Sequence, residues 1–266
     1  MLLSWLPLHV LADSTPLPTI AIIIDDVGHH YQNGTDLINL PYPLTLAFLP
    51  GRKYTQALSE MASLGNKEVM LHAPMENIQG LDLGFGGMTS HMSESEIKKI
   101  LEKNLNAIPN VVGINNHMGS LLTSRPSTMR WVMEHLQSTN FYFVDSRTSS
   151  ASIAGQMALA HAIPSASRDV FLDHKQTRKF VQSQFKKLLL IAQRQGSAIA
   201  IAHPHRVTID YLKWALPKLG ERGFRIATIS GLLNIRANEN REPTVTEPHT
   251  IASATAVPPQ ENAELD

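Results

Sequence analysis

Two adjacent carboxylates are the first residues in this chain whose types and position could do chemistry. Asp25 and Asp26 follow the apolar run 20–24, which favours a strand buried on both faces. Adjacent side chains of an extended strand point to opposite faces, so both serve one site only where the strand ends or bulges. A single aspartate at such a junction can simply cap the next helix. The tandem pair favours a functional site.

The elements that must position these residues alternate between strand and helix. This alternation predicts one α/β domain with a parallel sheet and right-handed crossovers, as a barrel or an open sheet. The expected strands are 20–28, 44–49, 67–72, 111–115, 141–145, 169–173, 197–203 and 225–229. In a parallel barrel, the carboxyl ends of all strands face one rim. The polar residues at or just past those ends are Asp25, Asp26, His72, His117, Asp145, Asp173 and His203.

The side chains at that rim suit a metal. Taken singly, a histidine after a strand is usually a loop residue, but three of them at separate strand ends favour convergence. One carboxylate with two neutral imidazoles fits a catalytic divalent metal with open positions. Zinc is the natural first choice, and Mn, Fe, Co or Ni would accept the same ligands. The chain has 12 histidines and no cysteine, which excludes thiolate sites and disulfides.

Composition limits the partners. The 23 basic and 23 acidic residues give a formal net charge of zero, so no electrostatic affinity for nucleic acid is expected. The apolar segment 1–12 resembles a signal peptide, although it lacks a positive start and the true start is left open. No run approaches the roughly 20 apolar residues of a membrane span. Residues 238–266 are rich in Glu, Pro, Thr and Ala, a composition typical of a disordered tail.

Several motifs carry a family resemblance. They are the tandem aspartates, HAPME at 72–76, GINNHMGS at 113–120, FVDSRT at 143–148, RDVFLD at 168–173 and AIAIAHP at 198–204. In this order they resemble the divergent polysaccharide deacetylases, distant relatives of the NodB-type carbohydrate esterases. The resemblance spans residues 19–235. It implies a single-domain, distorted (β/α) barrel of seven or eight strands and metal-dependent removal of N-acetyl groups from a glycan.

The resemblance also implies roles for individual residues. Asp25 matches the general base, Asp26 a metal ligand and His203 the general acid. The usual motif with two metal histidines has only His72 here, so we expect His117 of the next strand to complete the ligand set. The residues expected to position the base and the acid are Arg168, Asp173 and Asp145. The residues expected to bind the substrate or its oxyanion are Asn116, Gly119, Ser120 and Glu76.

Other functions fit parts of the same pattern. A protein of the cell envelope could bind a metal or a glycan at this rim without turnover, and only Asp25 and His203 argue for catalysis. A hydrolase acting on another amide or ester would use the same metal. A glycosidase with two carboxylates would give the histidines no role. The leading hypothesis is a periplasmic or secreted enzyme that deacetylates a polysaccharide or peptidoglycan-like glycan, with the oligomeric state open.

Overall fold

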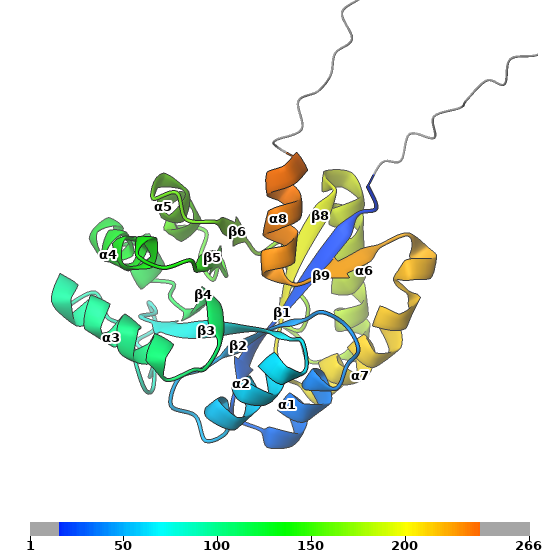
Figure 1. Cartoon of the computed structure of the whole chain (residues 1–266), viewed down its shortest axis with the longest axis horizontal. Helices are drawn as coiled ribbons and strands as arrows, with labels where there is room; N and C mark the ends of the chain where they lie inside the picture. The colour runs from blue at the N-terminus through cyan, green and yellow to red at the C-terminus, as the bar shows by residue number, and fades with distance from the viewer. Residues whose placement is uncertain (1–15, 240–266) are drawn as a thin grey trace, which may run out of the picture.

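The computed structural model describes residues 16–239, in which one parallel sheet is covered by helices (Figure 1). The strands are β1 (Thr19–Val27), β2 (Thr45–Phe48), β3 (Glu68–Met75), β4 (Val111–Met118), β5 (Tyr142–Asp145), β6 (Ser165–Ser167), β7 (Val170–Phe171), β8 (Ser197–Ala202) and β9 (Arg225–Ala227). The helices are α1 (Tyr31–Ile38), α2 (Thr55–Leu64), α3 (Glu94–Asn106), α4 (Pro126–Gln137), α5 (Ala154–Ala160), α6 (Arg178–Gln195), α7 (Arg206–Ala215) and α8 (Ile229–Glu239).

The sheet curls into an incomplete barrel. Its strand order is β6-β5-β4-β3-β2-β1-β8-β7, and β9 pairs with the first half of β1. The edge strands β6 and β7 are joined by Arg168 and Asp169 alone. Successive backbone N–H groups there donate to opposite edges, Arg168 to Asp145 of β5 (3.0 Å) and Asp169 to Ile199 of β8 (2.9 Å). The chain itself therefore bridges the gap in the barrel. The predicted distorted α/β barrel of a single domain is confirmed.

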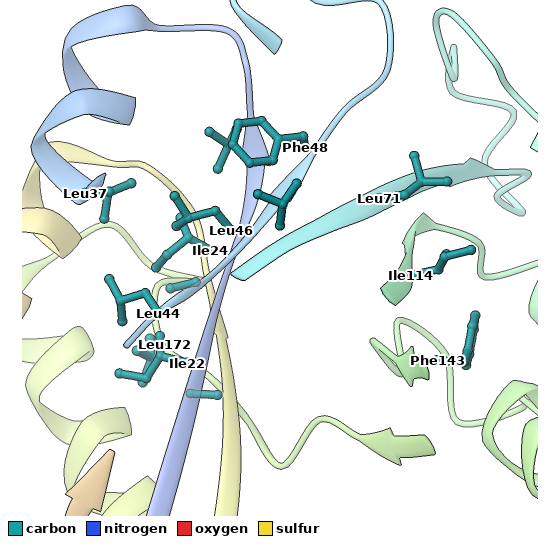
Figure 2. Packing of buried hydrophobic residues seen from close by; sticks show 14 of the residues in the cluster. Ile22, Ile24, Leu37, Leu44, Leu46, Phe48, Leu71, Ile114, Phe143 and Leu172 are labelled. Carbon is teal, nitrogen blue, oxygen red and sulfur yellow. The ribbon is translucent and has the colours of Figure 1, made fainter. Parts of the chain in front are cut away.

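The outer face of the sheet forms the larger core. Alternate residues of β1, namely Ile20, Ile22 and Ile24, are fully buried against the surrounding helices. Figure 2 shows Ile22 and Ile24 near Leu37 of α1 and Leu44. Because helices cover this face and residues of the barrel interior cover the other, the strand is apolar throughout, as its isoleucine run predicts.

A second core fills the barrel interior, and it includes α8. Ile229 and Leu232 of this helix pack against the inward-facing residues Ala21, Ile23, Ala47, Met70, Tyr142, Val144, Ile199 and Ile201. Polar bonds hold the start of the helix, because the Ile229 N–H donates to Thr45 Oγ1 (3.0 Å) and the Ser230 N–H to Glu68 Oε1 (3.2 Å). Helix α8 therefore closes the interior at the end where the strands begin, which leaves the opposite rim for a site.

Three details differ from the sequence prediction. The expected strand 169–173 is replaced by the short strands β6 and β7, because Ser165–Ser167 carries no apolar signal and pairs only through its backbone. Strands β3 and β4 extend past His72 and through His117, so the latter lies within a strand. Helix α8 was not expected, and it includes residues 238 and 239 of the predicted tail.

The predicted signal peptide, 1–12, and the tail from 240 onward lie outside the described residues. Within 16–239, no helix combines the length and apolar composition that crossing a bilayer requires.

Candidate functional site

A bulge at the end of β1 turns both aspartates toward one site. The pairing of β1 with β2 shifts register between Ile24 and Val27, and Asp26 has a left-handed backbone with φ of +56°. As a result, His72 Nε2 lies 3.6 Å from Asp25 Oδ2 and 3.4 Å from Asp26 Oδ1. The bulge that the sequence required if both carboxylates were to serve one site is present.

Three side chains form a compact group of metal-ligand type. Asp26 Oδ1 lies 3.4 Å from His72 Nε2 and 3.1 Å from His117 Nδ1, and the two imidazole nitrogens are 3.1 Å apart. The two histidines come from adjacent strands, where His72 pairs with Asn115 and His117 with Pro74. The parallel register therefore brings together the ligands that the sequence separates by 45 residues.

The charges in this group favour a cation. Burial opposes ionisation of Asp26, but hydrogen bonds from His117 and His72 outweigh it and hold the pKa of Asp26 well below its usual range. Burial would lower the pKa of His72, yet the carboxylates of Asp25 and Asp26 raise it. Asp26 Oδ1 is buried without a hydrogen-bond partner of good geometry among residues 16–239. A divalent cation would supply that oxygen with a partner and replace the protons on the imidazoles.

Asn115, which sequence reasoning missed, links the metal-ligand group to the predicted base. Its side chain is fully buried. Its Oδ1 lies 2.7 Å from His72 Nδ1, and its Nδ2 donates to Asp25 Oδ1 at 2.7 Å. Accepting the Nδ1 proton leaves His72 Nε2 free as a ligand, which is the usual way that proteins orient a metal-binding histidine. The available signal was an amide doublet, Asn115-Asn116, at the end of a buried strand.

Burial dominates the environment of Asp25. The residue is 2% exposed, and desolvation raises its pKa against the charges of His72 and His203 and the bond from Asn115. A carboxylate with a raised pKa is a better proton acceptor than an exposed one.

His203 and Asp173 form a hydrogen-bonded pair opposite these residues. His203 Nδ1 lies 2.9 Å from Asp173 Oδ1, and Asp173 Oδ2 accepts from the His203 N–H (2.7 Å) and from Thr208 Oγ1 (2.8 Å). Burial would lower the pKa of His203, but the Asp173 bond and the nearby carboxylates raise it to about 9. His203 Nε2 lies 3.9 Å from Asp26 Oδ2, so the charged imidazole faces the metal-ligand group. His205 could join Asp173 and His203 in a second group of ligand type.

Arg168, which was expected to position the base or the acid, forms hydrogen bonds with the turn after β5 and none with Asp25. Its Nε donates to Ser146 O (2.7 Å) and its Nη2 to Arg147 O (2.8 Å). Its guanidinium lies 4.1 Å from the Phe171 ring centroid, and that ring stacks on His203 at 5.9 Å. Arg168 therefore acts on the predicted acid through Phe171.

Asp145 faces away from the site. Its Oδ1 accepts from the Arg147 N–H (2.8 Å) and its Oδ2 from Ser152 Oγ (2.8 Å), so it holds the turn after β5.

The residues expected to bind substrate mainly hold loops in place. Asn116 donates to Met118 O (2.7 Å) and accepts from the Ser146 N–H (2.9 Å), which fixes the ends of β4 and β5. Ser120 Oγ accepts from the Ile78 N–H (3.0 Å), and Glu76 Oε2 accepts from the Ser90 N–H (2.6 Å). Gly119, with φ of +90°, turns the chain after β4.

Strained backbone lies along the same rim. Asp26, Met118 and Arg147 have φ of +56°, +54° and +46°. Asp26 is the second-last residue of β1, Met118 is the last of β4, and Arg147 lies two residues past the end of β5. Left-handed conformations of such residues cost free energy and persist where the surrounding structure fixes them, often at functional sites.

A cavity of about 280 Å³ opens beside the metal-ligand group. It is lined by Asp26, His29, His30, Asn33, Gln176, His203, Pro204, His205 and Arg206. Sequence reasoning did not identify His29, His30 or His205 as lining a cavity, because their proximity depends on the barrel bringing the ends of β1 and β8 together.

Comparison with known proteins agrees with this architecture. The family described as divergent polysaccharide deacetylase matches residues 22–233. An uncharacterized protein of Haemophilus influenzae is 34% identical over 202 residues, which cover 76% of this chain and 72% of that protein. The uncharacterized protein YibQ of Escherichia coli is 35% identical, over 77% of this chain and 65% of its own length.

Solved structures share the fold. A crystal structure of an uncharacterized protein from Agrobacterium tumefaciens C58 superposes with a TM-score of 0.78 and 24% identity, over 82% of this chain and 90% of that one. Peptidoglycan deacetylase PdaC from Bacillus subtilis gives 0.50 and 14%, over 84% and 94%. The family match, which extends over residues 22–233, shows that this protein belongs to the divergent polysaccharide deacetylases.

Proposed function

We propose that this protein is a metal-dependent hydrolase that removes N-acetyl groups from a polysaccharide of the cell envelope. The observation that carries the proposal is that a group of metal ligands, a candidate base and a candidate acid lie together on one rim. Asp26, His72 and His117 offer a metal three donor atoms 3.1–3.4 Å apart, with Asp25 on one side and the His203–Asp173 pair on the other. Family membership supports the glycan as substrate.

The donor set fits zinc. Ligands about 2.0–2.1 Å from a tetrahedral zinc ion are separated by about 3.3 Å, close to the distances found here. Two imidazoles and one carboxylate also leave positions open for water and substrate. We therefore propose Zn²⁺, held by Asp26, His72 and His117, as the cofactor.

Asp25 and His203 carry out the proton transfers of the proposed reaction, and Asp173 supports His203. Asp26, His72 and His117 would hold a divalent metal, which would polarise the acetyl carbonyl and lower the pKa of a water. Asp25, a buried carboxyl whose ionised form a neighbouring cation would favour, accepts the proton of the attacking water. His203 donates its proton to the departing amine as the C–N bond breaks, which yields acetate and an amino sugar. Asp173 keeps His203 protonated until that step and fixes its orientation.

The cavity lined by His29, His30 and His205 is the proposed place for the sugar that carries the acetyl group. It borders both Asp26 and His203, so a substrate there reaches the metal ligands and the acid together. We further propose that residues 19–235 form the catalytic domain and that 1–12 direct export, to the periplasm or outside the cell. Residues 238–266 are proposed to form a tail, of which 238 and 239 continue α8.

The test combines elemental analysis with acetate release. Purified protein and the variants Asp25→Asn and Asp26→Ala are assayed on acetylated chitooligosaccharides and on peptidoglycan. Wild type should hold one metal and release acetate, Asp25→Asn should keep the metal and lose turnover, and Asp26→Ala should lose both. Metal without acetate release from any acetylated glycan would favour a binding protein, and stoichiometric metal in Asp26→Ala would refute the ligand set.

A further inference from the structure

Arg52 contributes a guanidinium to the rim beside the metal-ligand group. Arg52 follows the turn after β2, and its Nε is buried with no hydrogen-bond partner among residues 16–239. None of the ion pairs in that part of the chain includes it. A partly buried guanidinium with unused donors costs free energy unless an acceptor binds it. The group therefore suits a ligand that carries an anion.

The side chain of Arg52 extends from the end of β1 to the long loop that follows β3. Its Cβ lies 3.2 Å from the position that a Cβ on Gly28 would occupy, and its Nη2 lies 2.8 Å from the same position on Gly84. Gly28 comes two residues after Asp26. Arg52 also contributes, after burial, to lowering the pKa of the neighbouring His29, which lines the catalytic cavity.

An exposed aromatic ring lies next to Arg52. Phe85 is 43% exposed and packs over Gly51, where an added Cβ would lie 2.5 Å from its Cγ. Lys103 of α3 places its Nζ 4.7 Å from the ring centroid. The two acidic residues of the same loop are engaged by its backbone, because Asp82 Oδ1 accepts from the Gly84 N–H (2.9 Å) and Glu76 Oε2 from the Ser90 N–H (2.6 Å). Two cations thus flank an apolar surface.

This combination matches the chemistry of an acidic sugar. The C–H face of a sugar ring packs on aromatic side chains, and a planar guanidinium binds a carboxylate through two parallel hydrogen bonds. We propose that Arg52, Phe85 and Lys103 form a subsite for a carboxylate-bearing sugar of the glycan, next to the sugar whose acetyl group is removed. The location rests on the proposed function, and the chemistry rests on Arg52, Phe85 and Lys103 alone.

Binding measurements test the subsite apart from catalysis. Calorimetry is run on metal-loaded protein carrying Asp25→Asn in every arm, so that no turnover occurs. The probes are a neutral tetrasaccharide of N-acetylglucosamine, one that alternates with N-acetylmuramic acid, and one that alternates with glucuronic acid. The probe with N-acetylmuramic acid carries a lactyl carboxylate and the probe with glucuronic acid carries a uronate, so comparing them distinguishes the two kinds of acidic sugar. Arg52→Gln and Lys103→Gln are compared with Arg52→Lys, and Arg194→Gln, exposed at the far end of α6, is the matched control.

We expect one carboxylated probe to bind about tenfold tighter than the neutral one, as a charge-assisted hydrogen bond implies. Arg52→Gln should remove the preference for the carboxylated probe and leave binding of the neutral probe unchanged. Lys103→Gln should reduce the preference, and Arg52→Lys should keep part of it. An undiminished preference in Arg52→Gln, equal weakening of all probes, or no preference in the parent protein would each overturn the subsite. Failure of acetate release would refute the proposed function without altering these affinity ratios.

Discussion

Replacing Asn115 should separate metal binding from proton transfer, because its amide serves both. It bonds His72 and Asp25, each at 2.7 Å, in a fully buried position. Asn115→Ala leaves the His72 Nδ1–H and an Asp25 oxygen without protein partners, at a cost of about 1–3 kcal/mol for each group. Loss of a residue that orients a metal ligand typically weakens metal affinity about 10–100-fold. We expect a loss in this range for Asn115→Ala.

Asn115→Asp gives the complementary result. The new carboxylate still accepts from His72, so metal affinity should stay near that of the wild type. It cannot donate to Asp25, and its negative charge should raise the pKa of Asp25 further, beyond the increase that burial causes in the wild type. Asp25 accepts a proton only when it is ionised. As the pH is lowered, turnover of Asn115→Asp should therefore begin to fall at a higher pH than turnover of the wild type.

The assay is competition for zinc with a chromogenic chelator, followed by pH profiles of acetate release. Asn140→Ala is the control, since Asn140 is exposed before β5 and far from the rim. If Asn115→Ala bound zinc within twofold of the wild type, the bridge would have no part in orienting His72.

Three further predictions concern the acid, the end of β1 and the metal. Asp173→Asn should lower the pKa of His203 from about 9 toward its ordinary value of about 6.5, so the imidazole loses its charge at a lower pH than in the wild type. NMR titration of the metal-free protein measures this pKa, and an unchanged value would exclude Asp173 as the cause of the raised pKa. Gly28→Ala should reduce stability by about 1–3 kcal/mol in urea denaturation, because its φ is +123° and the new Cβ would lie 2.4 Å from Thr55 Oγ1. Gly80→Ala, with φ of +66° and open space, is the control, and equal losses in both variants would assign the effect to backbone strain alone. Zinc at 100 times its dissociation constant should stabilise the wild type by about 2.7 kcal/mol, and His117→Ala should abolish the resulting shift in Tm; a retained shift would remove His117 from the ligands.

Local patterns were sufficient for the frame of this protein. The isoleucine run of β1, the S-x-x-E capping box at Ser93 and Glu96, and Gly196 after α6 each encode an element through nearby residues. Strand β6 and helix α8 escaped prediction because their formation depends on pairing with β5 and on the barrel interior, which no local pattern records.

The sequence by itself determined which residue types lie at strand ends, and hence that a carboxylate, two imidazoles and a further histidine could meet on one rim. Only the tertiary structure decided how they meet. The bulge at Asp26, the register that sets His117 beside His72, and the amide of Asn115 between His72 and Asp25 depend on contacts across strands. The same holds for Asp145, which turns outward to Ser152, and for Arg52, whose buried Nε has no hydrogen-bond partner within residues 16–239. Side-chain direction at a strand end is set by pairing and by the backbone turn that follows, and these are properties of the folded barrel.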